Sequence, residues 1–260
     1  MKMHPLFGKS DEDCPYPDYP FVYNITKDSL PDDLKPFDPR TEAYRLQVSE
    51  AGIYVEGPTK ASLVRASTTL GQLYDVVKDE KTKLTKLVFT RFPLSVSDEP
   101  RFGYRGLMVD TARNFVPGRV LMNIMLGMAW AKLNVLHWHI TDNDSFPFKS
   151  RKYPNLADKA AFSSEEIYTQ EEVKELLDYA ENLGITIVPE IDMPGHSYAL
   201  GHEEALRDIV TCYDCDIPWG TLPNHPIQGV YANSPLDPTM EKTYEYSQNM
   251  LEELNELFGK

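Results

Sequence analysis

The sequence lacks an apolar run long enough to cross a bilayer. A transmembrane helix needs about 18 or more consecutive apolar residues, and no segment of the 260 residues approaches that length. Residues 1–21 also lack the basic start and the apolar middle of a secretory signal peptide. We therefore expect no membrane partner, and either no secretion by this route or a true start further upstream.

Positive charge is scarce as well. The chain has 26 Lys and Arg residues against 40 Asp and Glu residues, a formal net charge of -14. Such a surface repels phosphate backbones and anionic lipid headgroups, so we expect no nucleic-acid partner, whereas a neutral sugar is compatible with it. No G-x-G-x-x-G segment follows a predicted strand, and a nucleotide site therefore has no support.

Only three cysteines are present, Cys14, Cys212 and Cys215, and the last two form a C-x-x-C pair. A structural zinc site needs about four ligands, and there is no second cysteine pair to complete one. We therefore expect no metal and no cofactor, and favour a loop disulfide or free thiols. The sequon at Asn24 could accept a glycan only in a secretory compartment.

The apolar content is sufficient for a substantial core, since hydrophobic residues make up 42% of the chain. Residues 1–40 are rich in proline and are predicted to form an irregular lead-in. Residues 41–97 are predicted to form a small α+β domain, with a hairpin at 44–55, a helix at 61–77 and a strand at 87–89.

Residues 98–260 alternate between predicted strands and predicted helices. Strands are expected at 107–109, 134–140 and 185–188, and helices after Pro117, after the capping box at 169–172 and from Asp237 to the end of the chain. Strands that alternate with helices in this way form a parallel sheet. A barrel and a doubly wound sheet are the two candidate architectures.

Acids or histidines follow each of the three strands: Asp110, Asp142, Glu190, Asp192 and His196. The carboxyl ends of parallel strands meet at one edge of a sheet. Polar side chains gathered there are typical of the active face of a TIM barrel. The sequence therefore predicts a functional site at this edge.

Three segments, at residues 101–113, 132–147 and 189–196, resemble family 20 glycoside hydrolases, the β-N-acetylhexosaminidases. They read RFGYRGLMVDTAR, KLNVLHWHITD followed by SFP, and PEIDMPGH, and their order and spacing are similar to that family. The resemblance covers roughly residues 40–260. It implies an α/β fold, an incomplete TIM (β/α)8 barrel of the first three β/α units at 98–260, preceded by a small α+β domain.

The resemblance also implies a mechanism. These enzymes retain the anomeric configuration without a protein nucleophile, because the 2-acetamido oxygen of the substrate attacks the anomeric carbon. A Glu protonates the leaving oxygen and later activates water, and the Asp immediately before it orients the acetamido group. The implied substrates are glycans that end in N-acetylglucosamine or N-acetylgalactosamine.

Roles can be carried over residue by residue. Arg105 matches an arginine that binds sugar hydroxyls, with a salt bridge between strand and loop as the structural alternative. Asp142 and His196 match a carboxylate–histidine pair that supports the acid/base Glu. Asp192 and Glu190 are expected to give structural support to that loop.

His137 and His139 allow a different interpretation. Residues i and i+2 of a strand point to the same face, as the two histidines of a metal-dependent hydrolase would. The strand continues past them to Asp142, so they are expected to lie deeper than the active face. Packing and hydrogen bonding inside the barrel is the alternative that we favour.

The catalytic Asp-Glu pair of the family follows its fourth strand. Here Asp-Glu occurs at residues 11–12, 79–80 and 98–99, and none of these pairs follows a strand of the predicted barrel. Residues 101–260 number 160, whereas a complete barrel needs about 250. We therefore expect the acid/base Glu to be missing from this chain, which would be inactive alone.

Three hypotheses about partners and function remain open at this point. The chain could be the front part of a hexosaminidase whose site needs a complementing fragment or a homodimer. It could instead be a non-catalytic carbohydrate-binding protein, or a metal-dependent hydrolase that uses His137 and His139. The family resemblance implies a lysosomal or secreted location, although no signal peptide is visible.

Overall fold

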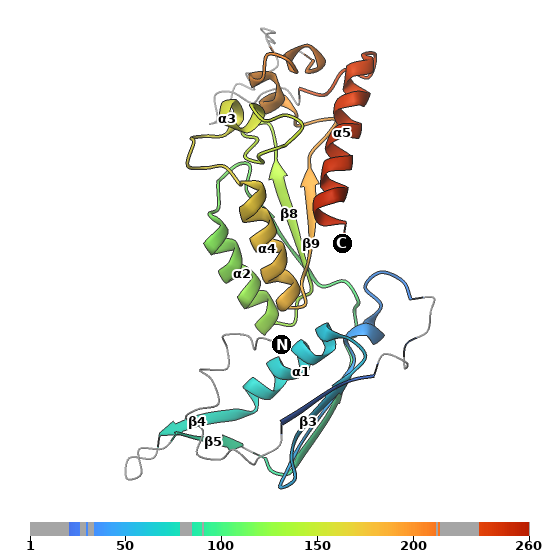
Figure 1. Ribbon diagram of the computed structural model, residues 1–260, viewed down its shortest axis with the longest axis vertical. Coiled ribbons are helices and arrows are strands. Elements are labelled where there is room, and N and C mark those ends of the chain that lie inside the picture. Colours follow the sequence, from blue (N-terminus) through green and yellow to red (C-terminus); the bar gives the residue numbers. More distant parts are fainter. Residues whose placement is uncertain are drawn as a thin grey trace, which may run out of the picture. The chain divides into compact units, whose positions relative to one another are not determined.

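A computed structural model describes residues 21–26, 30, 34–78, 85–89, 91–211, 213 and 234–259 (Figure 1). The predictions for the three cysteines and for the Asp-Glu pairs at 11–12 and 79–80 fall outside these residues. Within the described part, no helix has the length and apolar character needed to cross a membrane.

The chain divides into two compact units. The first unit comprises residues 1–105, 126–134 and 181–185, and the second comprises residues 106–125, 135–180 and 186–260. Each unit has its own sheet, and the first unit includes residues 126–134 and 181–185, which lie within the range predicted for the strand–helix part.

The first unit is built on a four-stranded sheet in the order β1-β3-β2-β6. Its strands are β1 (Phe21–Ile25), β2 (Tyr44–Ser49), β3 (Gly52–Gly57) and β6 (Leu94–Asp98), and a separate hairpin joins β4 (Tyr74–Lys78) to β5 (Thr85–Phe89). A 3-10 turn, η3 (Pro39–Glu42), precedes β2. Strand β1 pairs parallel with β3, and the other pairs are antiparallel.

The core of the first unit lies between this sheet and helix α1 (Lys60–Gln72). Alternate residues of β2 are buried, as expected for a strand with one covered face. Leu46 and Val48 pack in one cluster with Leu63 and Leu70 of the helix. Thr59 caps the helix by accepting a hydrogen bond from the backbone N–H of Ser62 at 3.2 Å.

Two expectations for this region are wrong. The lead-in at 1–40 is not irregular throughout, because residues 21–25 form β1 and pair with β3. The predicted helix at 61–77 ends at Gln72, and Val76 and Val77 are exposed residues of β4. The spacing of the apolar residues is compatible with a longer helix and also with a helix followed by a strand. Residues 74–78 form a strand because they pair with β5.

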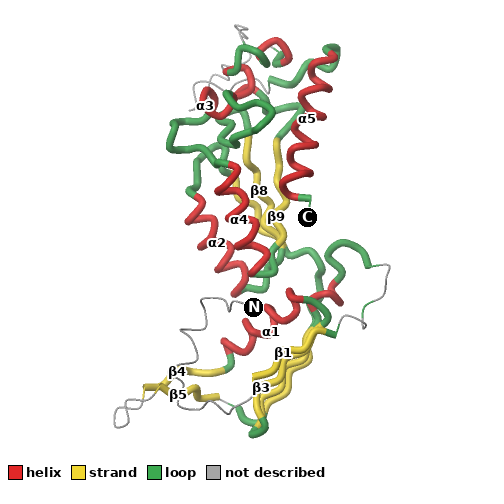
Figure 2. The backbone as a smooth tube through the Cα atoms, in the orientation of Figure 1, coloured by secondary structure: helices red, strands yellow, loops and turns green. Residues whose placement is uncertain are grey.

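The second unit contains a three-stranded parallel sheet in the order β7-β8-β9. Its elements are β7 (Gly106–Asp110), α2 (Gly118–Trp130), β8 (Val135–Thr141), α3 (Leu156–Ala160), α4 (Gln170–Asn182), β9 (Thr186–Ile191), η4 (Tyr198–His202), η5 (Arg207–Ile209) and α5 (Glu241–Phe258). Figure 2 shows this alternation of strands and helices. The predicted parallel α/β arrangement is confirmed.

The boundaries of α4 follow the predicted capping signals. Thr169 Oγ1 accepts from the backbone N–H of Glu172 at 3.2 Å, and Glu172 accepts in return from the N–H of Thr169 at 3.0 Å. Gly184, just beyond the helix, has a φ of 65°, the left-handed conformation that glycine adopts without steric cost. Helix α4 therefore begins and ends where its sequence indicates.

Helix α5 lies beside β9 (Figure 1), and its buried face matches the expected one only in part. The sequence spacing predicts that Met240, Tyr244, Met250, Leu251 and Leu254 point inward, and of these Met250 and Leu254 are buried. Tyr244 and Leu251 are exposed, whereas Tyr246 and Glu253 are buried. Glu253 accepts hydrogen bonds from Ser150 Oγ and from the N–H of Arg151, and these loop partners are distant in sequence, so periodicity alone could not reveal them.

Candidate active site

The site lies where the strands of the second unit end. Asp110 is the last residue of β7, and Asp142 follows the last residue of β8. Asp192 follows β9, and His196 lies in the loop beyond it. Parallel strands bring these positions to one edge of the sheet, as the sequence predicts.

Asp142 is the centre of this site, and its side chain is 1% exposed. Its Oδ1 accepts hydrogen bonds from Nδ1 of His196 at 2.9 Å and from the N–H of Asn143 at 2.6 Å. Its Oδ2 accepts from Nε2 of His139 at 3.0 Å and pairs with Nη2 of Arg113 at 2.5 Å. All of its lone pairs are therefore occupied by donors, as a buried carboxylate requires.

His196 adopts an unusual backbone conformation, with a φ of 57°. Such conformations of residues other than glycine concentrate at functional sites. Because Nδ1 donates to Asp142, the neutral ring keeps Nε2 as a free acceptor. Asn143 fixes the same loop, since its Oδ1 accepts from the N–H of Tyr198 at 3.1 Å.

Arg113 was not singled out from the sequence, yet it lies in the site. Its Nη1 donates to Asp110 Oδ2 at 2.6 Å, and its Nη2 pairs with Asp142. Burial works against the charge of Arg113, but the bonds to Asp110 and the charge of Asp142 outweigh it and raise the pKa of the guanidinium. With its side chain 40% exposed, Arg113 keeps N–H groups available for a ligand.

His139 and His137 share one carboxylate. Glu190 Oε2 lies 3.2 Å from Nδ1 of His139 and also bonds Nε2 of His137. Burial would lower the pKa of His139, but hydrogen bonds to Glu190 and Asp142 outweigh it and raise this pKa above its ordinary value. Burial likewise opposes the charge of Glu190, and the bonds from the two histidines nevertheless lower its pKa.

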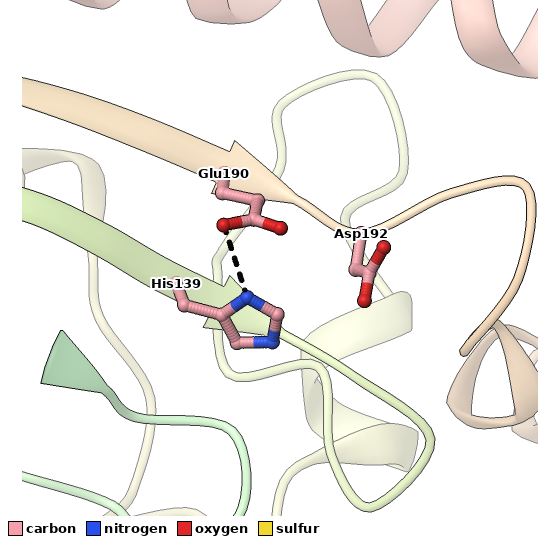
Figure 3. A group of neighbouring side chains, drawn as sticks. All are labelled: His139, Glu190 and Asp192. Carbon is pink, nitrogen blue, oxygen red and sulfur yellow. Dashed lines mark ion pairs between the residues drawn. The ribbon is translucent and has the colours of Figure 1, made fainter. Parts of the chain in front are cut away.

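Asp192 is the least constrained acid of the site. Figure 3 shows it beside His139 and Glu190. Its Oδ2 lies 3.9 Å from Nδ1 of His196, beyond hydrogen-bond distance. Burial raises the pKa of Asp192, and attraction to His196 and His139 offsets only part of this rise. The carboxylate oxygens of Asp192 can accept hydrogen bonds from a ligand.

Two sets of ligand atoms converge closely enough to hold a cation: His139 with Glu190 and Asp192, and Asp142 with Asp192 and His196. Within each set the atoms lie within 4.8 Å of one another. A metal would have to displace bonds that His139 and Arg113 already make to these carboxylates. Among the described residues His137 belongs to neither set, so the H-x-H pair does not form the two-histidine ligand set considered above.

Arg105 lies elsewhere, and the prediction that it belongs to this site is wrong. It precedes the first residue of β7, whereas the site follows the last. Its Nη2 pairs with Glu42 at 2.7 Å, and its Nε and Nη1 donate to the carbonyls of Lys132 and Phe102, each at 2.8 Å. The salt bridge named as the alternative is what the structure contains.

Glu42 joins Arg105 to a second buried cation. Arg65 Nε pairs with Glu42 at 2.5 Å, and the Arg65 guanidinium also donates to the carbonyls of Leu183 and Gly184. Asn134 Nδ2 completes the cluster by donating to Glu42 at 2.6 Å. These bonds hold the first unit together, which gives Arg105 a structural purpose.

Position relative to the strand could have distinguished the two arginines. Arg113 comes three residues after the acid that ends β7, on the side where a parallel sheet places its site. Arg105 comes before the strand, on the opposite side.

A buried carboxylate that bonds a histidine and an arginine lies at the carboxyl ends of three parallel strands, where α/β enzymes place their active sites. Residues 102–260 match the catalytic domain of glycosyl hydrolase family 20. The chain belongs to this glycosidase family, as its three sequence segments indicated.

Curated relatives include a β-hexosaminidase of Emericella nidulans, 38% identical over 221 residues, which cover 84% of this chain and 35% of that protein. The human β-hexosaminidase subunit beta is 31% identical over 218 residues, covering 84% and 36% of the two chains. The chain thus spans about a third of the length of these relatives.

Solved structures of the family superimpose on most of the chain. The exo β-N-acetylglucosaminidase of Vibrio harveyi, in complex with N-acetylglucosamine, has a TM-score of 0.67 and 31% identity, covering 85% of this chain and 35% of that one. The β-N-acetylhexosaminidase of Bacteroides fragilis has a TM-score of 0.69 and 26% identity, covering 92% and 43%. The α/β fold is therefore shared with these glycosidases.

Proposed function

We propose that this chain carries the front part of a β-N-acetylhexosaminidase site that removes terminal N-acetylhexosamine by substrate-assisted, retaining catalysis. The observation that carries the proposal is the hydrogen bond between Asp142 and His196 at the carboxyl edge of a family 20 sheet. Related proteins named β-hexosaminidase support the same reaction class.

The Asp142–His196 pair would support the acid/base group of this reaction. With its Nδ1 proton held by Asp142, His196 offers Nε2 to the carboxyl group of an acid/base Glu. An imidazole at that place orients the carboxyl group and affects how readily it gives up its proton. His196 is thus a positioning residue in this proposal, not the group that protonates the leaving oxygen.

Arg113 would bind hydroxyl groups of the terminal sugar. Nη1 and Nη2 each direct one N–H to Asp110 and Asp142, and Nε lies 3.7 Å from Asp144. The second N–H of each Nη is available in a fixed planar arrangement. Adjacent sugar hydroxyls can accept from such a fork. Arg113 therefore takes the substrate-binding role that was first assigned to Arg105.

We further propose that the three parallel strands are the first three units of a (β/α)8 barrel, whose remaining units and acid/base Glu lie outside these 260 residues. The coverage of about a third of the curated relatives supports this. So does the exposure of the apolar side chains of Leu107 and Met108 on the edge strand β7. The 260-residue chain would then be inactive alone, and a complementing fragment or second chain would complete its site.

Calorimetric binding of a thiazoline analogue of N-acetylglucosamine to the 260-residue chain tests this function. We expect saturable binding that weakens at least tenfold, about 1.4 kcal/mol, in His196→Ala. Turnover of an aryl N-acetyl-β-glucosaminide should require a fragment that supplies the missing Glu. Absence of binding by both the chain and its complemented form would contradict the proposal.

The same experiment separates the alternatives. Binding that persists while complementation gives no turnover would favour a non-catalytic carbohydrate-binding protein. Stoichiometric metal in the purified chain, with hydrolysis abolished by a chelator, would favour the metal-dependent hydrolase. Because His137 lies outside both converging sets of ligand atoms, we favour the glycosidase.

A further inference from the structure

Five side chains of the second unit form an unbroken series of alternating imidazoles and carboxylates: His137, Glu190, His139, Asp142 and His196. The two terminal members are partly exposed, with side-chain exposures of 37% for His137 and 38% for His196. His139 and Asp142, in the interior of the series, are buried. The state of the buried members is therefore set by their neighbours in the series and not by solvent.

His139 is the member on which the series depends. Its Nε2 lies 3.0 Å from Asp142 Oδ2, and its Nδ1 lies 3.2 Å from Glu190 Oε2. A carboxylate can only accept a hydrogen bond, so both ring nitrogens of His139 must carry protons for both bonds to form. The geometry is that of an imidazolium between two carboxylates (Figure 3 shows the bond to Glu190).

We propose that Glu190 is a positioning residue that holds His139 as an imidazolium, and that this cation and Arg113 together hold Asp142 as the acceptor for Nδ1 of His196. The role of His196 rests on the proposed function, whereas the state of His139 does not. Glu190 touches neither Asp142 nor His196 and acts on them through His139. It therefore does more than support a loop.

Charged side chains surround the ring of His139. Strand β9 and the loop after it bring Glu190 and Asp192, and strand β7 brings Asp110, whose charge also favours the imidazolium. Arg113 opposes it but is paired with Asp110 and Asp142. The carboxylates outnumber the cations around the ring, and the raised pKa of His139 agrees with the geometric argument.

Nitrogen NMR of the imidazole side chains in the 15N-labelled 260-residue chain tests this proposal. We expect His139 to show two protonated nitrogens well above the pH at which an ordinary histidine becomes neutral. His202 provides an internal reference, because burial, with a smaller effect of Arg207, lowers its pKa. His196 should show a proton on Nδ1 when neutral, instead of the commoner Nε2 form.

Glu190→Gln removes the carboxylate and retains the shape of the side chain. We expect the midpoint of the His139 titration to fall by at least one pH unit, a tenfold loss of proton affinity. Glu190→Asp should restore part of it. Glu175→Gln, which removes an exposed carboxylate from α4, is the matched control and should leave the His139 titration unchanged.

A neutral His139 at neutral pH in the unmodified chain would overturn the proposal, and this result needs no variant to fold. An unchanged His139 titration in a folded Glu190→Gln chain would overturn it as well. An imidazolium at His139 in a chain that fails to bind the thiazoline would leave this inference standing and remove the proposed function. Thiazoline binding by a chain with a neutral His139 would support the proposed function and overturn this inference.

Discussion

Arg113 Nη2 and His196 Nδ1 lie 3.3 Å apart, and both face the carboxylate of Asp142. Two donors at this distance do not hydrogen bond to each other, so the carboxylate between them holds them together. The sugar-binding group and the positioning group of the proposed site therefore depend on one buried side chain. Several expectations can be tested from this arrangement.

Asp142→Asn should weaken thiazoline binding at least tenfold and lower the free energy of unfolding by about 3 kcal/mol, because it leaves His139 and Arg113 without a buried counter-charge. Calorimetry and urea denaturation would measure the two effects. Asp144→Asn is the control, since that side chain is 46% exposed and lies 3.7 Å from Arg113. Equal effects of both substitutions would contradict the central place of Asp142.

The two arginines should behave in opposite ways. Arg113→Ala should abolish most sugar-analogue binding with little loss of stability. Arg105→Ala should lower the free energy of unfolding by about 3 kcal/mol, since it removes one of the cationic partners of buried Glu42. Folded Arg105→Ala should still bind the analogue, and a selective loss of binding in this variant would restore the original assignment.

Gly184→Ala should destabilise the chain by about 1 kcal/mol, because a left-handed residue with a side chain is strained and its Cβ would lie 3.3 Å from Ala61. Gly127→Ala is its counterpart in helix α2, where an added Cβ meets nothing within 4 Å. That substitution should stabilise the helix by about 0.5–1 kcal/mol. Thermal and urea unfolding would show whether the two effects differ in sign.

Stability should decline on both sides of neutrality. Folding lowers the pKa values of Glu190 and Asp110, so these groups stabilise the folded chain at any pH above their ordinary pKa values. This stabilisation is lost as the pH falls through their lowered pKa values in the folded chain. Folding raises the pKa of His139, so this group stabilises the folded chain fully when the pH is below the ordinary pKa of histidine. This stabilisation is lost as the pH rises through the raised pKa of the folded chain. Urea denaturation between about pH 2 and 10 should show both declines, and His139→Gln should lose mainly the alkaline one.

Much of the fold could be predicted because the local sequence pattern of an element agrees with the surroundings of that element in the structure. Strand β8 has apolar residues at four of its seven positions, and the capping signals of α4 are local, so both elements were found from the sequence. The same holds for Asp142 and His196, which follow strands. Strand β1 was missed because prolines surround it, and its pairing with β3 joins residues far apart in the chain.

Other features depend on partners that no local pattern contains. Buried Glu253 on α5 is satisfied by a loop about a hundred residues earlier, so a carboxylate shares the inward face of the helix with the apolar Met250 and Leu254. Arg105 and Arg113 are chemically identical, and only their positions relative to β7 separate a structural cation from a site cation. Three-dimensional context decided each of these cases.

The single carboxylate oxygen shared by His137 and His139 has a consequence for evolution. Replacement of Glu190 alone would leave His137 Nε2 and His139 Nδ1 without their carboxylate acceptor, and loss of either histidine would alter the charge balance of the other. Positions 137, 139 and 190 should therefore covary among related proteins as one inherited group. Lineages that have abandoned this chemistry should have changed all three together.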